Sequence, residues 1–198
     1  MEHSTIVSLN RTPFLTHKPM TAEDTLTRVR KLDIAALADM HDRYYPDVYR
    51  YVRYRVDDEG LTEDLTSEVF MRLLDALHKR SGPKKNLRSW LIGTASNLVN
   101  DHYRKHYRHQ TESIEDEDAF TSPDNPEAVF DGQMENQQLK LAIQQLTSEQ
   151  QHVLALRFSQ ELSLEKTAAQ MKKSVNAVKA LQFRAISTLK RLLDAPRQ

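Results

Sequence analysis

One side of a predicted helix carries side chains suited to binding single-stranded nucleic acid. Trp90, Thr94, Asn97, Asp101 and Arg104 follow one another at steps of 4, 3, 4 and 3, so they form one stripe on a helix, which we call the single-strand stripe. An aromatic ring can stack on a base, an amide can bond to its edge, and a cation can bind phosphate. Taken singly, Trp90 also fits a core position, and Asp101 with Arg104 fits an ordinary surface pair.

A helix-turn-helix pattern near the C-terminus is the second candidate site. Residues 164–171 predict a short helix, a turn follows, and Ser174 can cap a longer helix that begins at Val175. The outer face of that helix could read base edges in a major groove, although two packed helices with a solvated face would show the same pattern. For Phe183 we expect burial, with contact to a thymine methyl as the alternative. The candidate DNA-binding residues are Lys172, Lys173, Ser174, Asn176, Ala177, Lys179, Ala180, Gln182, Phe183 and Arg184.

A third candidate surface is acidic. Asp64, Ser67, Glu68 and Met71 share a helix face opposite the leucines, which would suit docking of a basic partner helix. A solvated face with acids near the helix N-terminus is an equally natural explanation.

Chemistry of other kinds finds little support in the sequence. His102, His106 and His109 recur at helical spacing and could in principle ligate zinc, but Arg and Lys interleave with them and would repel a cation. The chain has no Cys and only 4 Gly, and we find no nucleophile–base pair, carboxylate dyad or phosphate-binding glycine loop. We therefore predict a binding protein with no cofactor and no metal, and not an enzyme.

Charge is unevenly distributed along the chain. Lys and Arg number 28, as do Asp and Glu, yet residues 70–110 hold nine cations against two acids and residues 157–193 hold eight against two. Between them, residues 110–136 carry nine acids and no cation. Two basic modules on an acidic tether suit bipartite binding to a polyanion, although solvated helix faces would also explain the charge runs.

Apolar periodicity predicts the elements that position these residues. Steps of three and four indicate helices over 32–56, which Pro46 could kink or split, over 61–79 and over 86–107, and helical periodicity returns over 137–193. We predict an all-α chain of two small helical domains joined by an acidic flexible linker. Its parts are an N-terminal extension over 1–31, flexible and with room for a short helix at its end, a domain over 32–109, the linker over 110–137, and a helix-turn-helix domain over 138–194.

Nothing in the sequence suggests a membrane protein. No apolar run approaches the roughly 20 residues that span a bilayer, and the N-terminus lacks the apolar core of a secretory signal. We expect a cytoplasmic protein with no membrane insertion.

Four segments resemble motifs of bacterial RNA polymerase sigma factors of the extracytoplasmic-function (ECF) group. Residues 64–70 read Asp-Leu-Thr-Ser-Glu-Val-Phe, similar to the group's D-L-T-Q-E-V-F. Residues 90–97 read Trp-Leu-Ile-Gly-Thr-Ala-Ser-Asn and, with Asp101 and Arg104, resemble W-L-x-x-I-A-x-N-x-x-x-D-x-x-R. Residues 146–157 resemble the opening of the group's second conserved domain, and residues 177–185 its recognition helix.

The resemblance implies a role for each candidate surface. Contacts to the −35 element of promoter DNA would come from the helix-turn-helix residues named above. An anti-sigma factor is implied as a further partner, and the polymerase flap is implied as a contact besides the clamp. The helix that docks on the clamp coiled coil of the largest subunit of core RNA polymerase would carry Asp64, Thr66, Ser67, Glu68, Val69, Phe70 and Met71. Contacts to the −10 element of promoter DNA, where a base flips out, would come from Arg80, Lys84, Lys85, Arg88, Trp90, Thr94, Asn97, Asp101, Arg104 and Lys105.

Two departures from the pattern and two rival functions stay open. Ser67 replaces the usual Gln of the docking motif. In the recognition helix Ala180-Leu181 replaces the common Ser-Arg, so this helix could read a different −35 sequence. One rival is a helix-turn-helix regulator that acts without polymerase, which would not need the acidic docking face. The other is a helical adaptor or a metal-dependent enzyme that uses the histidines.

Overall fold

The computed structural model describes residues 22–112 and 131–194. Within these ranges every regular element is a helix, which confirms the predicted all-α class. The elements are α1 (Ala22–Arg30), α2 (Ile34–Arg55), α3 (Glu59–His78), α4 (Leu87–Glu112), α5 (Asp131–Gln144), α6 (Ser148–Leu154), the π-helical turn η1 (Ala155–Ser159), α7 (Leu164–Met171) and α8 (Val175–Leu193).

The N-terminal helices form a bundle around α2. Side chains cap two of the helices: Asp33 accepts the Ala36 N–H at the start of α2, and Asp58 accepts the Leu61 N–H at the start of α3. Pro46 lies inside α2, which continues through it as one helix. The bundle core is apolar and fully buried, with Val48, Val52, Val69, Leu73, Leu91 and Val99.

Helix α1 lies where the sequence allowed a short helix at the end of the N-terminal extension. It lies within the extension expected over 1–31, yet Leu26 and Val29 are buried in the bundle core. Arg28 also binds both carboxylate oxygens of Asp33, at 3.0 and 3.1 Å, across the turn to α2. Apolar burial thus fixes this short helix to the bundle.

The C-terminal helices form a second, smaller core. Thr147 and Gln150 make a capping box at α6, Ser163 caps α7, and Ser174 caps α8 by accepting the Ala177 N–H. The short helix α7 ends at Lys172 in a left-handed conformation, as a tight turn between two helices requires. The predicted helix-turn-helix is therefore present. Its core comprises Leu146, Val153, Leu154, Ala168, Val178, Leu181 and Ala185.

The acidic linker expected over 110–137 is shorter than predicted at both ends. Helix α4 continues to Glu112, and α5 begins at Asp131. The middle of the segment, residues 113–130, lies outside the described residues.

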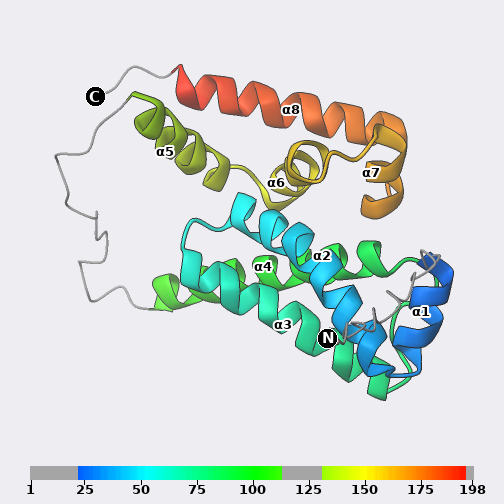
Figure 1. The fold of residues 1–198 in the computed structure, drawn as a ribbon. Coiled ribbons are helices and arrows are strands. Elements are labelled where there is room, and N and C mark those ends of the chain that lie inside the picture. The colour runs from blue at the N-terminus through cyan, green and yellow to red at the C-terminus, as the bar shows by residue number, and fades with distance from the viewer. Residues whose placement is uncertain (1–21, 113–130, 195–198) are drawn as a thin grey trace, which may run out of the picture.

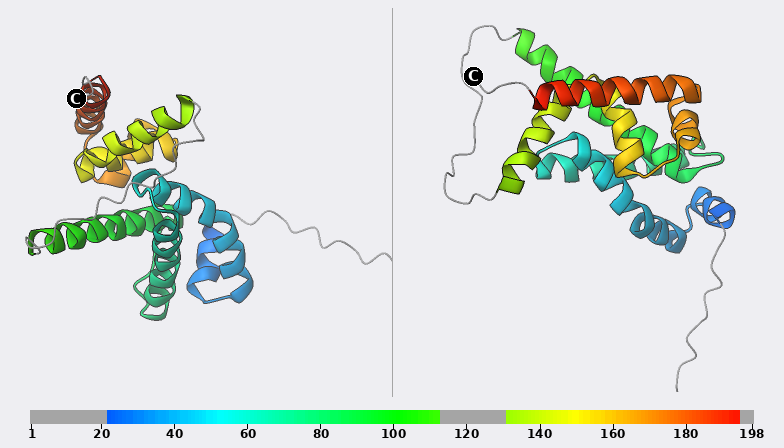
Figure 2. Two further views of the ribbon diagram at one scale, coloured as in Figure 1. Left: turned by 90° about the vertical axis from the view of Figure 1, so that its left-hand side faces the viewer. Right: turned by 90° about the horizontal axis from the view of Figure 1, so that it is seen from above.

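The two groups of helices pack against each other. Figure 1 shows α5 to α8 as a layer above α2 and α4, with α1 and α3 on the far side of the bundle, and Figure 2 shows the same stacking from two further directions. Leu156 of η1 is wholly buried and belongs to the core cluster of the N-terminal bundle. Chain segments that the sequence analysis treated as separate modules thus share an interface.

Candidate nucleic-acid interface

The interface between the two modules is built around a buried cation. Arg55, at the end of α2, is 1% exposed. Its guanidinium donates to the Tyr51 hydroxyl at 3.0 Å and to Asn100 Oδ1 at 2.7 Å within the N-terminal bundle. Across the interface it donates to Gln151 Oε1 of α6, at 3.3 Å from Nη2 and 3.4 Å from Nε. All of these partners are neutral oxygens, so hydrogen bonds rather than an ion pair compensate the burial of its charge.

A half-buried histidine lies beside this cation. His152 Nδ1 of α6 is 2.6 Å from the Tyr51 hydroxyl, and the two rings meet edge to face. Burial, and secondarily the positive charge of Arg55, lowers the pKa of His152 from 6.5 to about 4. The ring is therefore neutral at physiological pH, and Nδ1 can accept a hydrogen bond from the Tyr51 hydroxyl.

Further polar contacts surround this centre. Arg88 pairs with Asp47 at 2.7 Å and donates to Gln160 Oε1 at 2.8 Å, and Gln160 Nε2 donates to the Asp47 carbonyl at 2.9 Å. Gln170 of α7 donates to the Ser89 carbonyl at 2.8 Å. At the other end of the interface, Lys140 of α5 pairs with Asp57 at 2.8 Å and lowers the pKa of that carboxyl.

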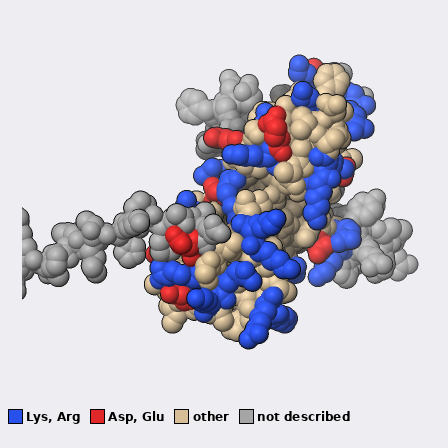
Figure 3. Space-filling model, turned by 90° about the vertical axis from the view of Figure 1, so that its right-hand side faces the viewer, with Lys and Arg blue, Asp and Glu red and all other residues tan. Residues whose placement is uncertain are grey.

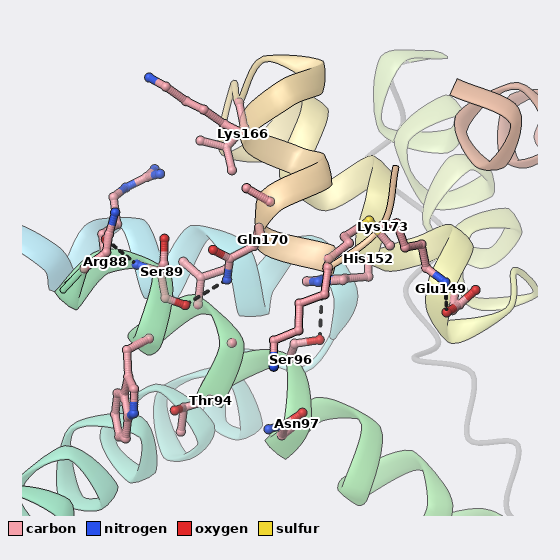
Figure 4. A pocket seen from close by; sticks show the side chains of 18 of the residues that line it. Arg88, Ser89, Thr94, Ser96, Asn97, Glu149, His152, Lys166, Gln170 and Lys173 are labelled. Carbon is pink, nitrogen blue, oxygen red and sulfur yellow. Dashed lines mark hydrogen bonds and ion pairs between the residues drawn. The ribbon is translucent and has the colours of Figure 1, made fainter. Parts of the chain in front are cut away.

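A cleft of about 890 Å³ opens between α4 and the helices α6 and α7. From α4 it is lined by Trp90, Thr94 and Asn97 of the single-strand stripe, and from the other module by Lys166 and Lys173, among others. Figure 4 shows Thr94 and Asn97 on α4 below the cleft, with Lys166, Gln170 and Lys173 across it. In this arrangement the stripe and the start of the helix-turn-helix lie opposite each other.

The remaining candidate residues for the −10 element are either exposed or engaged in contacts within the protein. Arg80, Lys84 and Lys85 of the α3–α4 loop are exposed, as is Lys105. Arg88 is half-buried in its contacts with Asp47 and Gln160, so it is not open to DNA in this arrangement.

The stripe itself has mixed surroundings. Trp90 is half-buried against the bundle core, as one of the two interpretations allowed. Asp101 and Arg104 form an ion pair with each other, and together with Asn97 they line a smaller adjoining hollow. Thr94 and Asn97 are the polar stripe residues that line the cleft, and no ion pair of the described side chains involves either of them.

Most of the candidate −35 residues lie on the outer face of α8 or at its start. Lys172, Ser174, Asn176, Ala177, Lys179, Ala180 and Arg184 are exposed. Phe183 is 72% exposed, so the expectation that it is buried was wrong: Leu181 and Ala185 on either side of it face the core instead. Gln182 accepts a hydrogen bond from Arg157 at 3.1 Å, and Lys173 pairs with Glu149 at 2.8 Å, so both are engaged within the module.

The acidic docking face is partly as expected. Asp64, Ser67, Glu68 and Met71 are exposed on α3, and Glu68 binds Arg72 at 2.9 Å. The other three residues of the docking motif, Thr66, Val69 and Phe70, are buried. They hold α3 in the bundle and cannot themselves touch a partner.

Sequence reasoning missed the residues at the centre of the interface. Tyr51, Arg55, Gln151 and His152 were not singled out, because nothing local marks a residue that contacts a second module. The available signal was an arginine at position 55, which lies four residues after Tyr51 and seven after Val48 and therefore on the apolar face of the predicted helix.

The histidines that could in principle ligate zinc lie mostly outside the side chains that the structure describes. The side chains of His106 and His109 lie outside the described residues, and among the described ones no three candidate ligands gather as a metal site requires. The absence of a metal at these histidines remains a prediction. None of the described helices is long and apolar enough to cross a membrane.

Comparison with known proteins defines the class. The family described as Sigma-70 region 2 matches residues 40–109, and the family described as Sigma-70, region 4 matches residues 142–191. Each match covers one of the two modules, so this is a sigma-70-type factor. In a solved structure, CnrH in complex with the cytosolic domain of CnrY, the similar chain is 20% identical with a TM-score of 0.63, covering 87% of this chain and 97% of that one, which shows a shared fold.

Two relatives narrow the class to one group. The ECF RNA polymerase sigma factor BldN of Streptomyces coelicolor is 36% identical over 171 residues, which cover 86% of this chain and 65% of BldN. The ECF RNA polymerase sigma factor SigC of Mycobacterium tuberculosis is 30% identical over 155 residues, which cover 75% of this chain and 77% of SigC. The chain belongs to the ECF RNA polymerase sigma factors, and is thus an alternative sigma factor that acts in promoter-specific transcription initiation.

Proposed function

We propose that this sigma factor divides promoter recognition between its two modules. The domain over 32–109 binds and melts the −10 element through the single-strand stripe and the α3–α4 loop, and the domain over 138–194 reads the −35 element with α8. The observation that best supports this is that two different DNA-binding faces, an amide- and hydroxyl-bearing stripe on α4 and a basic exposed face on α8, lie on separately cored modules. The protein acts by binding in the cytoplasm, not by catalysis.

Docking on core polymerase falls to α3. Of the motif, Asp64, Ser67, Glu68 and Met71 are exposed and offer two carboxylates beside an apolar side chain that is 60% exposed. Such a face suits a coiled coil that presents basic residues. Figure 1 shows α3 on the side of the bundle away from the C-terminal module, so polymerase could engage this helix without first disturbing the interface.

Promoter binding requires the two modules to separate. In the structure Thr94 and Asn97 face Lys166 and Lys173 across the cleft, which leaves duplex or melted DNA no route to both faces at once. Many of the contacts between the modules are polar, and hydration of the same groups offsets their loss on opening. Binding to polymerase would hold the modules apart.

Regulation follows from the same geometry. CnrH is found in complex with the cytosolic domain of CnrY, and we infer that an anti-sigma factor also controls this chain. A protein that bridges the two modules would hold them in the arrangement in which the stripe faces the helix-turn-helix domain across the cleft.

Run-off transcription with purified core enzyme on genomic fragments tests the function. We expect discrete start sites only when the chain is present, and binding to core enzyme in a pull-down. A chain that binds duplex DNA but neither binds core enzyme nor starts transcription would instead be a helix-turn-helix regulator.

Charge reversal tests the docking face. Glu68→Arg should weaken binding to core enzyme by about tenfold or more, because a carboxylate that faces basic residues becomes a like charge. Asp39→Arg makes the same change at an exposed position on α2 and is the matched control. Equal affinities for the two variants would remove α3 from the docking surface.

A further inference from the structure

A small basic hollow lies where the end of α1 meets the end of α3. Thr27, Arg30 and Lys31 line it from α1 and the following turn, and Leu77, Arg80 and Gly82 line it from the end of α3 and the loop beyond, around a volume of about 340 Å³. Arg30, Lys31 and Arg80 are exposed, and no carboxylate of the described chain forms an ion pair with any of them. We call these three cations the α1 basic patch.

The acids closest in sequence are already engaged. Asp33 is bound in a bidentate contact by Arg28, and Asp75 pairs with Lys79 at 3.8 Å. The positive charge of the α1 basic patch is therefore not balanced by these neighbours, and an anion that entered the hollow would meet three cations.

The patch is held on a rigid support. Val29, next to Arg30, is wholly buried, and the Lys31 and Leu32 N–H groups donate back to the carbonyls of Arg28 and Val29 at 3.0 Å. Leu32 adopts φ 58°, a left-handed conformation that the surrounding contacts must maintain. Arg30 and Lys31 thus project from a fixed turn, which lowers the entropy lost when they bind.

The patch continues the surface assigned to the −10 element. Arg80 begins the α3–α4 loop that also carries Lys84 and Lys85, and Figure 3 shows Lys and Arg gathered on the face of the molecule that contains α1 and this loop. Helix α1 itself lies outside the stretch matched by Sigma-70 region 2, which begins at residue 40. Arg30 and Lys31 are therefore an addition to the matched surface rather than a part of it.

We propose that Arg30 and Lys31, together with Arg80, bind backbone phosphates of the promoter DNA next to the −10 element. The inference rests on the proposed function. Guanidinium and ammonium groups around a shallow hollow suit phosphate oxygens, and the hollow offers no amide side chain that would read a base. The contact strengthens promoter binding without regard to sequence.

The test measures how binding of the holoenzyme to a promoter fragment depends on salt. The fragment comes from the run-off experiment, trimmed to carry the −10 element and not the −35 element. Arg30→Ala/Lys31→Ala should reduce the slope of log affinity against log salt by about 0.7 to 0.9 per lost phosphate contact. The double variant should lose the same affinity on a fragment whose −10 element is substituted. Asn97→Ala should instead change the ratio of the affinities for the original and the substituted fragment.

Two further variants serve as controls. Lys190→Ala/Arg191→Ala removes two charges near the far end of α8 and should leave the slope on this fragment unchanged. Arg30→Lys/Lys31→Arg keeps both charges and should retain the original slope. Circular dichroism and binding to core enzyme are measured for every variant before DNA is added.

Each result has one meaning. A holoenzyme that initiates correctly but shows an unchanged slope for Arg30→Ala/Lys31→Ala overturns the patch and leaves the proposed function standing. A variant that loses affinity for core enzyme shows that the cations contact an acidic protein surface instead, which also overturns it. Failure of the unaltered chain to initiate on any template overturns the proposed function itself.

Discussion

The core of the N-terminal bundle and the interface between the modules both bury side chains, but they are built from different chemistry. The core of the N-terminal bundle consists of apolar side chains, of which Val48, Val52 and Leu73 are completely buried. The interface buries Arg55 and half-buries His152, and hydroxyl and amide groups hydrogen-bond to both. Among the residues described, Ala155 and Leu156 of η1 are the fully buried apolar residues that the second module adds to the first core.

The difference teaches which part of the molecule can open. Exposing a valine core to water costs free energy in proportion to the apolar area, with nothing regained. Separating Arg55 from Gln151 exposes a cation and an amide that water solvates well. Each module can therefore stay folded while the interface opens, and the variants below test that distinction in order of expected effect.

Removing core volume should have the largest effect. Leu73→Ala is expected to lower the free energy of unfolding by about 2 to 5 kcal/mol, because it removes buried methyl groups and leaves a cavity. Met71→Ala replaces an exposed residue on the same helix and should alter the free energy of unfolding by no more than about 0.5 kcal/mol. Urea unfolding of the full chain measures both. Similar values for the two variants would mean that α3 does not pack as described.

Removing the partner of a buried charge should come next. Gln151→Met leaves Arg55 without its acceptor across the interface and is expected to favour the open form by about 2 kcal/mol or more. The double variant Arg55→Met/Gln151→Met removes the charge as well, so it should stay more closed than the single variant. Equal opening of the two would show that the cation is not what the glutamine compensates.

The chain's own composition makes this measurable. It has no Cys, so Asp75→Cys and Arg191→Cys, at exposed positions on α3 and α8, can be labelled specifically with spin labels. The distribution of distances between the labels reports opening without any change in the core.

The sequence predicted the helices well and their contacts poorly. Residues 164–171 were predicted as a helix and form α7 at those bounds, because capping by Ser163 and the turn at Lys172 are local signals. Phe183 was wrongly placed, since a single position on a helical face depends on which neighbour faces the core. The packing of the modules is a contact between residues 51–55 and 151–152, about a hundred positions apart, and no periodicity encodes it.

Acidification should loosen the closed form through His152. Its pKa is lowered to about 4 in the buried site, while in an open or unfolded chain it would lie near 6.5. Protons therefore favour the open or unfolded states, so stability is complete above pH 6.5 and falls as the pH drops toward 4, by about 2 kcal/mol at pH 5.

A non-titrating replacement isolates this effect. His152→Asn keeps an acceptor near the Tyr51 hydroxyl and should show a smaller loss in stability between pH 7 and pH 5 in urea unfolding. Asp57, whose pKa is lowered by Lys140, loses its contribution at lower pH than this window. Parallel pH profiles for the original chain and the variant would exclude His152 as the titrating group.

Removing a single hydroxyl should have the smallest effect and separate interface from core most clearly. Tyr51→Phe keeps the buried ring but removes the oxygen that accepts from Arg55 and lies 2.6 Å from His152 Nδ1. About 1 kcal/mol should be lost from the closed form, because the ring still fills its volume while a hydrogen bond is gone. If the loss belongs to the interface, the label distances shift toward the open form while the urea midpoint of the N-terminal bundle stays the same. A lowered midpoint with unchanged distances would instead assign Tyr51 to the core, and the two regions would then not differ in the way proposed.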